Sequence, residues 1–383
     1  MRAFDVAIIG AGIMGAATAC ELARAGAQVA LLDQSALPNP RAASIDHSKV
    51  FRFAYPDALY AQMAARALKL WRSLEEETGA HLLTDTGVLM LGREQSSVEA
   101  DTYETLRSLG LQVEMLDNRE TTARFPQFNR DALGYSVYDP SGALLHAERA
   151  VCALIDLARQ RGVHIIEGER VTNIKQSANA RVRIVTESGN EFDCARACAA
   201  SGPWTRNLLP FLRDNLKTTR QEVVYFEPET SASQNFDAGR FPIFIDLDSG
   251  FYGFPIHHAG AMKIANHHKG ERTEMDSYAP QVGDEFIQKC RDFFREFIPQ
   301  LASARVRETR VCVYNNTPDD DFIIDWHPEI ENALIVTGFS GHGFKFGSIV
   351  GRIGAELLLS GRTSHNIDRF SLARFDIKNE VSR

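Results

Sequence analysis

The chain has 383 residues, of which 44% are hydrophobic and 24% are charged, so its composition is that of an ordinary globular protein. At about 150 residues per domain, this length predicts two or three structural units. Lys and Arg total 42 and Asp and Glu total 50, which gives a net charge of -8. This charge disfavours nucleic acid or an anionic membrane surface as a partner.

Six cysteines, none of them in a CxxC pair, are too few for a disulfide scaffold and indicate a reducing cytoplasm. The apolar stretch from Val6 to Cys20 resembles a signal peptide in composition. However, Asp5 precedes it, Gly10 and Gly12 interrupt it, and it is too short to span a bilayer. We therefore expect a cytoplasmic protein.

The first fifty residues predict a dinucleotide site. A short strand at 4–9 leads into Gly10-Ala11-Gly12-Ile13-Met14-Gly15, a helix at 16–26 follows, and a second strand at 28–32 ends at Asp33. The glycines allow a tight turn and close approach to a pyrophosphate, while the helix N-terminus attracts phosphate charge. Asp33 would accept hydrogen bonds from a ribose. The pattern does not decide between NAD and FAD, which share the ADP half.

Further elements are predicted along the chain by hydrophobic periodicity and turn residues. The first half of the chain is expected to contain a helix at 61–79, a strand at 84–92, helices at 96–109 and from about 119, and a long helix within 142–161. Strands follow at 163–166, at 181–186 and at 195–200, and the last of these ends in a Gly-Pro break at 202–203. The remaining elements are strands at 223–226 and 243–245, a hairpin that pairs 251–254 with 262–264, a helix at 284–297, and a strand–loop–helix unit at 333–359.

The most informative segment lies near the C-terminus. It contains Cys312-Val313-Tyr314 and the string Gly-Phe-Ser-Gly-His-Gly-Phe-Lys-Phe at 338–346. With the N-terminal fingerprint, it resembles the family of monomeric sarcosine oxidase, N-methyltryptophan oxidase, pipecolate oxidase and the fructosyl-amino-acid oxidases, within the D-amino-acid-oxidase-like flavoproteins. The resemblance spans essentially the full chain and implies FAD as the cofactor.

The resemblance also implies a fold. It is a Rossmann-type FAD-binding domain interleaved with a substrate domain that is built on a large mixed or antiparallel sheet. We expect the FAD-binding domain at 1–85, 142–218 and 315–383, and the substrate domain at 86–141 and 219–314. A monomer is expected.

Several site residues follow from the resemblance, each where the family's motif matches. Cys312 would be bonded covalently to the flavin, and Arg52 and Lys345 would hold the substrate carboxylate. Lys263 would promote reaction with oxygen, and Tyr314 would lie near the substrate. Tyr252 and Lys49 complete the predicted catalytic set. The predicted contacts to FAD are Gly10, Gly12, Ile13, Met14, Gly15, Asp33, Gln34, Ser44, Lys49, Thr172, Gly202, Trp204, Cys312, Gly341, His342, Gly343, Phe344 and Lys345.

One segment departs from the family. Sarcosine oxidases have an S-H-H-G-D-T-R-like run before the arginine, whereas this chain has Ser-Ile-Asp-His-Ser-Lys at 44–49. Ile45 replaces a histidine and Lys49 replaces an arginine. Lysine at this position resembles the fructosyl-amino-acid oxidases, so sarcosine itself is in doubt as the substrate.

The residues themselves are consistent with these roles. Strand alternation places Lys263 between two alanines, which leaves room for a flat ring on that face. Lys345 would add a mobile cation near the N-terminus of a helix that begins near Ser348, where negative charge on a flavin is favoured. Arg310 could lower the pKa of Cys312 and favour its thiolate. The apolar neighbours of Arg52 favour a buried role over a solvated surface charge.

We predict no metal site. His257 and His258 lie at a turn, His267 and His268 lie at the far end of the hairpin, and the ligand spacing of zinc motifs is absent. Ser340 and His342 do not indicate a hydrolase, because no GxSxG elbow surrounds them.

The predicted function is an FAD-dependent oxidase of a secondary or N-substituted α-amino acid, which forms an imine and reduces oxygen to hydrogen peroxide. Fructosyl-amino-acid, saccharopine or pipecolate oxidation is an alternative within the family. A second alternative is a dehydrogenase of the same fold that passes electrons to a quinone or a carrier. A third, a flavin-binding module of a larger or RNA-modifying complex, is disfavoured by the acidic charge. The predicted partners are a small amino acid and oxygen.

Overall fold

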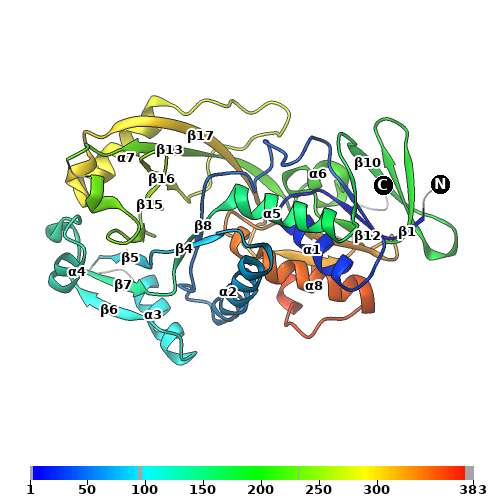
Figure 1. Ribbon diagram of the computed structural model, residues 1–383, viewed down its shortest axis with the longest axis horizontal. Helices are drawn as coiled ribbons and strands as arrows, with labels where there is room; N and C mark the ends of the chain where they lie inside the picture. Colours follow the sequence, from blue (N-terminus) through cyan, green and yellow to red (C-terminus); the bar gives the residue numbers. More distant parts are fainter. Residues whose placement is uncertain (1–2, 94–96, 232, 376–383) are drawn as a thin grey trace.

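The computed structural model describes residues 3–93, 97–231 and 233–375. Two large sheets dominate these residues, one towards each end of the long axis in Figure 1. A three-stranded sheet of β3 (Lys49–Phe51), β8 (Ala143–Leu145) and β4 (Leu83–Asp85) lies between them. The predicted combination of a Rossmann-type unit with a large mixed sheet is confirmed. The domain boundaries given above remain a prediction.

The first sheet carries the nucleotide fingerprint. Its strands run in the order β10-β11-β12-β1-β2-β9, with β19 added to β12 and β18 added to β19. The parallel pairs β12–β1, β1–β2, β2–β9 and β12–β19 form its centre. The strands are β1 (Ala3–Ile9), β2 (Val29–Leu32), β9 (His164–Ile166), β10 (Val171–Gln176), β11 (Val182–Thr186), β12 (Glu191–Ala199), β18 (Ile323–Trp326) and β19 (Ala333–Thr337).

Three helices pack together on one face of this sheet (Figure 1). They are α1 (Ile13–Arg24), α5 (Ala147–Gln160) and α8 (Gly347–Ser360), and the long α2 (Ala58–Thr78) packs against α8. Small residues on α1, among them Ala16, Ala17 and Ala19, are buried there and allow the helices to approach closely. The apolar residues that recur at helical spacing in these segments therefore explain why the helices form one layer against the sheet.

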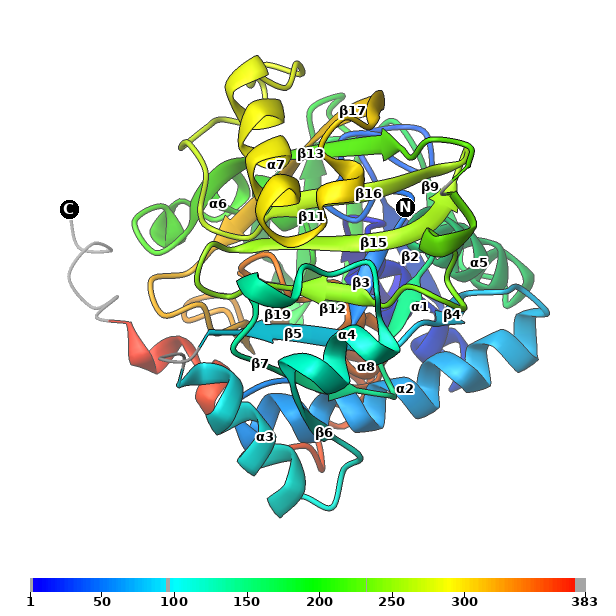
Figure 2. The same cartoon turned by 90° about the vertical axis from the view of Figure 1, so that its left-hand side faces the viewer.

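The second sheet is mostly antiparallel and runs in the order β17-β13-β16-β15-β14-β5-β7-β6. Helix α7 (Asp284–Phe297) covers its outer face through a phenylalanine-rich core (Figure 2). Short helices α3 (Val98–Ser108), α4 (Asn118–Arg124) and α6 (Thr205–Leu208) occupy connections. The strands are β5 (Val88–Gly92), β6 (Glu114–Asp117), β7 (Tyr135–Asp139), β13 (Lys217–Glu227), β14 (Ile243–Ile245), β15 (Phe251–His258), β16 (Ala261–Asn266) and β17 (Arg305–Asn316).

One predicted element differs from the structure, and two others can be compared with it. The single strand expected at 84–92 is two strands, β4 and β5, because Gly87 has a positive φ of 66° and turns the chain into another sheet. The helix expected within 142–161 is α5, which follows β8. The helix expected at 96–109 is α3, and residue 96 lies outside the described residues. Within the described ranges, no helix has the length and apolar character needed to cross a membrane.

Candidate active site

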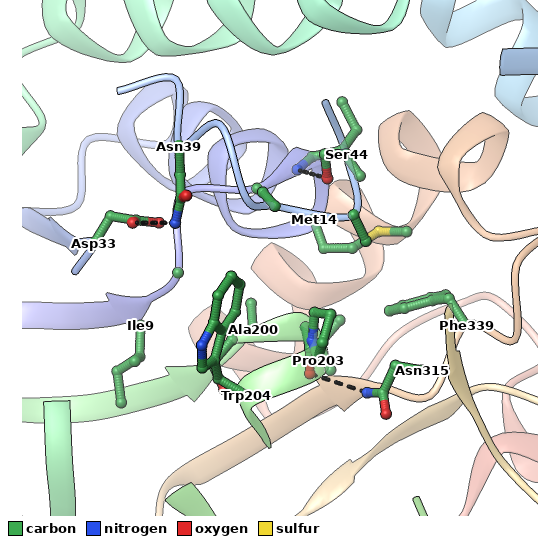
Figure 3. Close-up of a pocket in the computed structure, with 18 of the residues that line it drawn as sticks. Ile9, Met14, Asp33, Asn39, Ser44, Ala200, Pro203, Trp204, Asn315 and Phe339 are labelled. Atoms are coloured by element: carbon green, nitrogen blue, oxygen red, sulfur yellow. Dashed lines mark hydrogen bonds between the residues drawn. The ribbon is translucent and has the colours of Figure 1, made fainter. Parts of the chain in front are cut away.

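A cavity of about 280 Å³ opens at the carboxyl ends of β1 and β2. This is the crevice where open α/β sheets bind nucleotides. Figure 3 shows Met14, Asp33 and Ser44 on one side of it and Ala200, Pro203 and Trp204 on the other. Predicted contacts that line the cavity are Gly10, Gly12, Ile13, Met14, Asp33, Gln34, Ser44, Lys49, Thr172, Gly202, Trp204, Gly341, Gly343 and Phe344.

The glycines of the fingerprint are required by close backbone contacts. Gly10 has a φ of 100°, and a Cβ there would lie 2.5 Å from the carbonyl oxygen of Ala200. A Cβ on Gly15 would lie 1.8 Å from the carbonyl oxygen of Gly10. Neither contact is possible for a side chain, so the turn depends on these two residues. Gly15 thus shapes the loop from behind the cavity.

Polar side chains fix this loop in place. Asp33 accepts a hydrogen bond from the Ala11 N–H at 2.9 Å and another from Asn39 Nδ2 at 2.9 Å (Figure 3). Ser44 Oγ accepts from the Ile13 N–H at 3.0 Å, at the start of α1. Burial raises the pKa of Asp33. A buried acid at the end of the second strand is what a ribose site requires.

The cavity continues towards the second sheet through Lys49 and Tyr314. Lys49 Nζ lies 3.5 Å from Cys312 Sγ and 3.6 Å from Asp46 Oδ2. Burial alone would lower the pKa of Lys49, but the nearby Cys312 and Asp46 raise it above its usual range. Lys49 is therefore the cation beside Cys312. Arg310, which the sequence suggested for this role, pairs instead with Glu308 at 3.1 Å and Asp46 at 3.6 Å.

A buried ion pair lies behind Cys312. Lys263 is 1% exposed, and its ammonium donates to Asp46 Oδ2 at 2.5 Å and to the Ser48 carbonyl at 2.8 Å. Asp46 also accepts a hydrogen bond from Tyr225 Oη at 2.8 Å. Burial opposes ionisation of Asp46, but Lys263 and Lys49 outweigh it and hold its pKa well below its usual range. Burial lowers the pKa of Lys263, and Asp46 opposes that shift.

Arg52 and Lys345 flank the ring of Tyr55. The Arg52 guanidinium lies 4.2 Å from the ring centroid, and Lys345 Nζ donates to Tyr55 Oη at 2.8 Å and to the His342 carbonyl at 2.7 Å. Lys345 is only 4% exposed, so its amine is held in a fixed position, unlike the mobile cation expected from the sequence. Neither side chain forms an ion pair with a carboxylate of the described residues. Burial and Arg52 hold the pKa of Lys345 well below its usual range.

The aromatic and imidazole groups complete this end of the site. Tyr252 Oη and Tyr314 Oη lie 3.5 Å apart, and the Tyr314 ring lies 5.8 Å from His267. Burial, together with the charges of Arg52 and Lys345, lowers the pKa of His267 to about 4. His267 is therefore a neutral base at physiological pH, close to Arg52 and Lys345. The sequence considered His267 only as a metal ligand and missed this position.

Asp46 and Tyr55 are the other residues that sequence reasoning missed. Asp46 lies in the segment that departs from the family, and its spacing from Lys49 was the available signal. Tyr55 follows Arg52 by three residues and had no distinctive pattern. The structure brings Lys49, Cys312 and Lys263 to one cluster around Asp46.

Half-buried histidines make the fold sensitive to acid. Burial lowers the pKa of His267, and likewise of His146, His257 and His327, to about 4. An unfolded histidine has a pKa near 6.5, so between about pH 6.5 and 4 the unfolded chain binds more protons than the folded chain. We expect the thermal unfolding midpoint to fall as pH falls through this window. Thermal scans of the holoprotein across the window measure it; a flat midpoint would contradict the pKa directions.

These residues fit a flavin dinucleotide. The fingerprint loop, Asp33 and the start of α1 suit the ADP portion, and the cavity extends to Lys49 and Tyr314, beside Cys312 and the Lys263–Asp46 pair. One cavity lining includes both Asp33 and Tyr314, so a single ligand could extend from the fingerprint loop towards the second sheet. The fold and the site together define a dinucleotide-dependent oxidoreductase.

Comparison with known proteins supplies the family. Residues 5–357 match the family model described as "DAO: FAD dependent oxidoreductase", and the chain belongs to this family. It is 33% identical to monomeric sarcosine oxidase of Bacillus sp. (strain B-0618), over 99% of this chain and 98% of that one. It is 33% identical to mouse (Mus musculus) peroxisomal sarcosine oxidase, over 97% and 96% of the chains. It is 30% identical to N-methyl-L-tryptophan oxidase of Yersinia pestis (strain Pestoides F), over 97% and 99%. The predicted family is confirmed.

Solved structures share the fold. L-proline dehydrogenase from P. horikoshii superposes with a TM-score of 0.85 at 20% identity, covering 97% of both chains. Glycine oxidase from Geobacillus kaustophilus superposes with a TM-score of 0.83 at 20% identity, covering 98% of this chain and all of that one at 100%. At these identities the likeness concerns the fold.

Proposed function

We propose that the protein is an FAD-dependent oxidase of a secondary or N-substituted α-amino acid that uses oxygen as the electron acceptor. The observation that supports it most is the pair of basic side chains Arg52 and Lys345, which form no salt bridge among the described residues and whose charges both act on His267, beside the Tyr314 ring. A substrate carboxylate would supply the missing negative charge. The sarcosine and N-methyl-L-tryptophan oxidases among its relatives act on amino acids of this kind.

The chain's own residues position the substrate. Arg52 and Lys345 bind the carboxylate, and Lys345 is preorganised by its bonds to Tyr55 and His342. Neutral His267 accepts a hydrogen bond from the amine and favours its uncharged form. When bound, FAD would accept the hydride equivalent, two electrons and the hydrogen, from the carbon beside the amine nitrogen; the nitrogen loses a proton, and the resulting imine hydrolyses. Tyr252 and Tyr314 cover the pocket and exclude water.

The acceptor assignment depends on Lys263. Its ammonium is buried, held by Asp46, and lies on the face of β16 that is directed towards Lys49 and Cys312. A fixed positive charge stabilises the anion formed when oxygen takes up an electron. This charge supports oxygen as the acceptor, with hydrogen peroxide as the product. The dehydrogenase alternative has no comparable support in the site.

The substrate class is tested by anaerobic mixing of the purified yellow protein with a panel of amines. The panel contains sarcosine, N-methyltryptophan, L-pipecolate, L-proline, saccharopine and fructosyl-valine. We expect loss of the flavin absorbance with an N-substituted amino acid and no loss with the same amine lacking its carboxylate. If no compound bleaches the flavin, the substrate assignment is wrong while the cofactor assignment stands.

We also propose that Cys312 carries the flavin covalently. Cys312 Sγ lies 3.5 Å from the ammonium of Lys49, a residue that lines the cavity. We expect the wild-type protein to keep yellow colour after acid precipitation and Cys312→Ser to release it. Cys152→Ser, on the partly exposed helix α5, is the control and retains the colour. Release of flavin from the wild type would contradict covalent attachment.

Two properties of the whole molecule complete the proposal. Six free thiols favour a reducing compartment, so we place the enzyme in the cytoplasm. We propose a monomer as the working unit, which size-exclusion chromatography of the holoprotein tests directly.

A further inference from the structure

Lys345 differs from the other two lysines of the site in its partners. Lys263 Nζ lies 2.5 Å from an Asp46 carboxylate oxygen and Lys49 Nζ lies 3.6 Å from it, so both have an anionic partner. Lys345 is 4% exposed, and its amine has no carboxylate partner within the described part of the chain. A positive charge on Lys345 would therefore be buried without an anion, which is unfavourable.

The groups around the Lys345 amine are neutral or positive. Its Nζ donates to Tyr55 Oη at 2.8 Å and to the His342 carbonyl at 2.7 Å, and it lies 5.1 Å from the centroid of the Phe346 ring. The Arg52 guanidinium lies 4.2 Å from the centroid of the Tyr55 ring, and Lys345 Nζ lies 5.2 Å from the same point. Burial and Arg52 both lower the pKa of Lys345. Because arginine keeps its proton in proteins, the repulsion is relieved when the lysine loses its own.

The hydrogen bonds of Lys345 match those of a neutral amine. Such an amine has two N–H groups and a lone pair, whereas an ammonium has three N–H groups. The acceptors of Lys345 among the described residues are Tyr55 Oη and the His342 carbonyl. Tyr55 Oη also lies 3.2 Å from His342 Nδ1, and His342 Nε2 lies 3.1 Å from the Asp320 carbonyl. A carbonyl only accepts, so Nε2 carries the proton, Nδ1 accepts from Tyr55, and Tyr55 Oη accepts from Lys345.

We propose that Lys345 is an uncharged amine in the free enzyme and is the base that takes the proton from the ammonium group of a zwitterionic substrate. This inference rests on the proposed oxidase function and assigns the ionic form of the amino acid that enters the site. A hydride can leave the carbon beside the nitrogen only after the nitrogen regains its lone pair. An N–H bond of the substrate ammonium breaks, an N–H bond forms on Lys345 Nζ, and no electrons leave the substrate in this step.

The transfer creates a charge where the substrate can balance it. The titratable groups that face Lys345 are Arg52, Tyr55, His342 and His267, and Arg52 is the charged one of these at neutral pH. After the transfer, the Lys345 ammonium has the substrate carboxylate as acceptor for its third N–H. This carboxylate favours the charged form, so the proton stays on Lys345 while the substrate is bound. His267 has a pKa of about 4, so it accepts a hydrogen bond from the amine without taking its proton.

Proton uptake on binding of an unreactive ligand tests this assignment. Methoxyacetate has the carboxylate and the chain length of sarcosine, but an ether oxygen replaces the amine, so it brings no proton and cannot form an imine. Calorimetric titration of the holoprotein at mildly alkaline pH, in two buffers that differ in ionisation enthalpy, counts the protons taken up. We expect one proton for each methoxyacetate bound, because its carboxylate favours the charged form of Lys345.

Variants identify the group that takes the proton. Lys345→Arg has a positive charge that cannot be released, so it should bind methoxyacetate without proton uptake. Lys69→Arg makes the same change at an exposed residue of α2 and should keep the uptake. His267→Gln should also keep it, because the imidazole is neutral before and after binding. Retention of the flavin absorbance shows that each variant is folded, and Lys345→Met replaces Lys345→Arg if the arginine disturbs that absorbance.

The outcomes separate this inference from the proposed function. Binding of methoxyacetate to the wild type without proton uptake would show that Lys345 is already charged, and it would overturn the inference while the carboxylate site stands. Uptake that survives in the Lys345 variant and is lost in His267→Gln would overturn it in favour of His267 as the base. If methoxyacetate does not bind the wild type at all, the carboxylate site is wrong and the inference falls with it.

Discussion

Replacing Lys263 by methionine is expected to slow reoxidation of the reduced flavin by about 10² to 10³-fold, the loss typical of removing one preorganised electrostatic group. Methionine matches the length of lysine but removes the buried charge that faces the flavin space. Flavin reduction by the amine should change far less, because Lys263 contacts neither Arg52 nor Lys345. Stopped-flow mixing of the reduced enzyme with oxygen measures the first rate, and anaerobic mixing with amine measures the second.

A control separates charge from general damage. Lys289→Met removes an exposed lysine from α7, where it pairs with Glu285, and should leave both rates unchanged. Asp46→Asn keeps Lys263 but removes its anionic partner, so we expect an intermediate loss of oxygen reactivity. Unchanged reoxidation in Lys263→Met would show that the oxygen-reactive charge lies elsewhere.

Removing either cation of the carboxylate site is expected to weaken use of the substrate strongly. A hydrogen bond to a charged group contributes about 1.5 to 3 kcal/mol, so Arg52→Gln and Lys345→Met should each lower kcat/KM by about 10 to 10²-fold. The loss should be mainly in KM for Arg52→Gln. Lys345→Met also loses the bonds to Tyr55 and His342, and its kcat should fall as well.

The substrate's own charge provides the matched comparison. The wild type should prefer an N-methyl amino acid to its amide, and Arg52→Gln should lose most of this preference. Lys69→Gln, which changes an exposed residue of α2, should behave like the wild type. If both site variants keep the wild-type preference for the acid, the carboxylate is bound by other residues.

Local sequence predicted the nucleotide half of the site because its chemistry is local. The turn at Gly10 to Gly15, the start of α1 and Asp33 lie within one strand–helix–strand unit, and short-range periodicity is enough to place them. The resemblance to sarcosine oxidases extended the prediction to Cys312, Lys263 and Lys345. Their grouping could then be expected, although no contact between them could be.

What the sequence could not predict depends on pairs that are distant in the chain. Lys263 and Asp46 are separated by more than two hundred residues. Their ion pair forms only because β16 packs against the loop that precedes β3. The same holds for Lys49, which replaced Arg310 as the cation beside Cys312. The break between β4 and β5 was missed because the two strands are only three residues apart and the turn between them depends on a single positive φ, at Gly87.

Aerobic turnover of the best amine, with oxygen uptake and peroxide formation measured together, tests the central claim most directly. The account predicts equal amounts of oxygen consumed and peroxide formed, with the flavin returning to its oxidised absorbance when the amine is exhausted. Flavin that is bleached by the amine but stays reduced in air, with no peroxide, would contradict an oxidase and favour a dehydrogenase of the same fold.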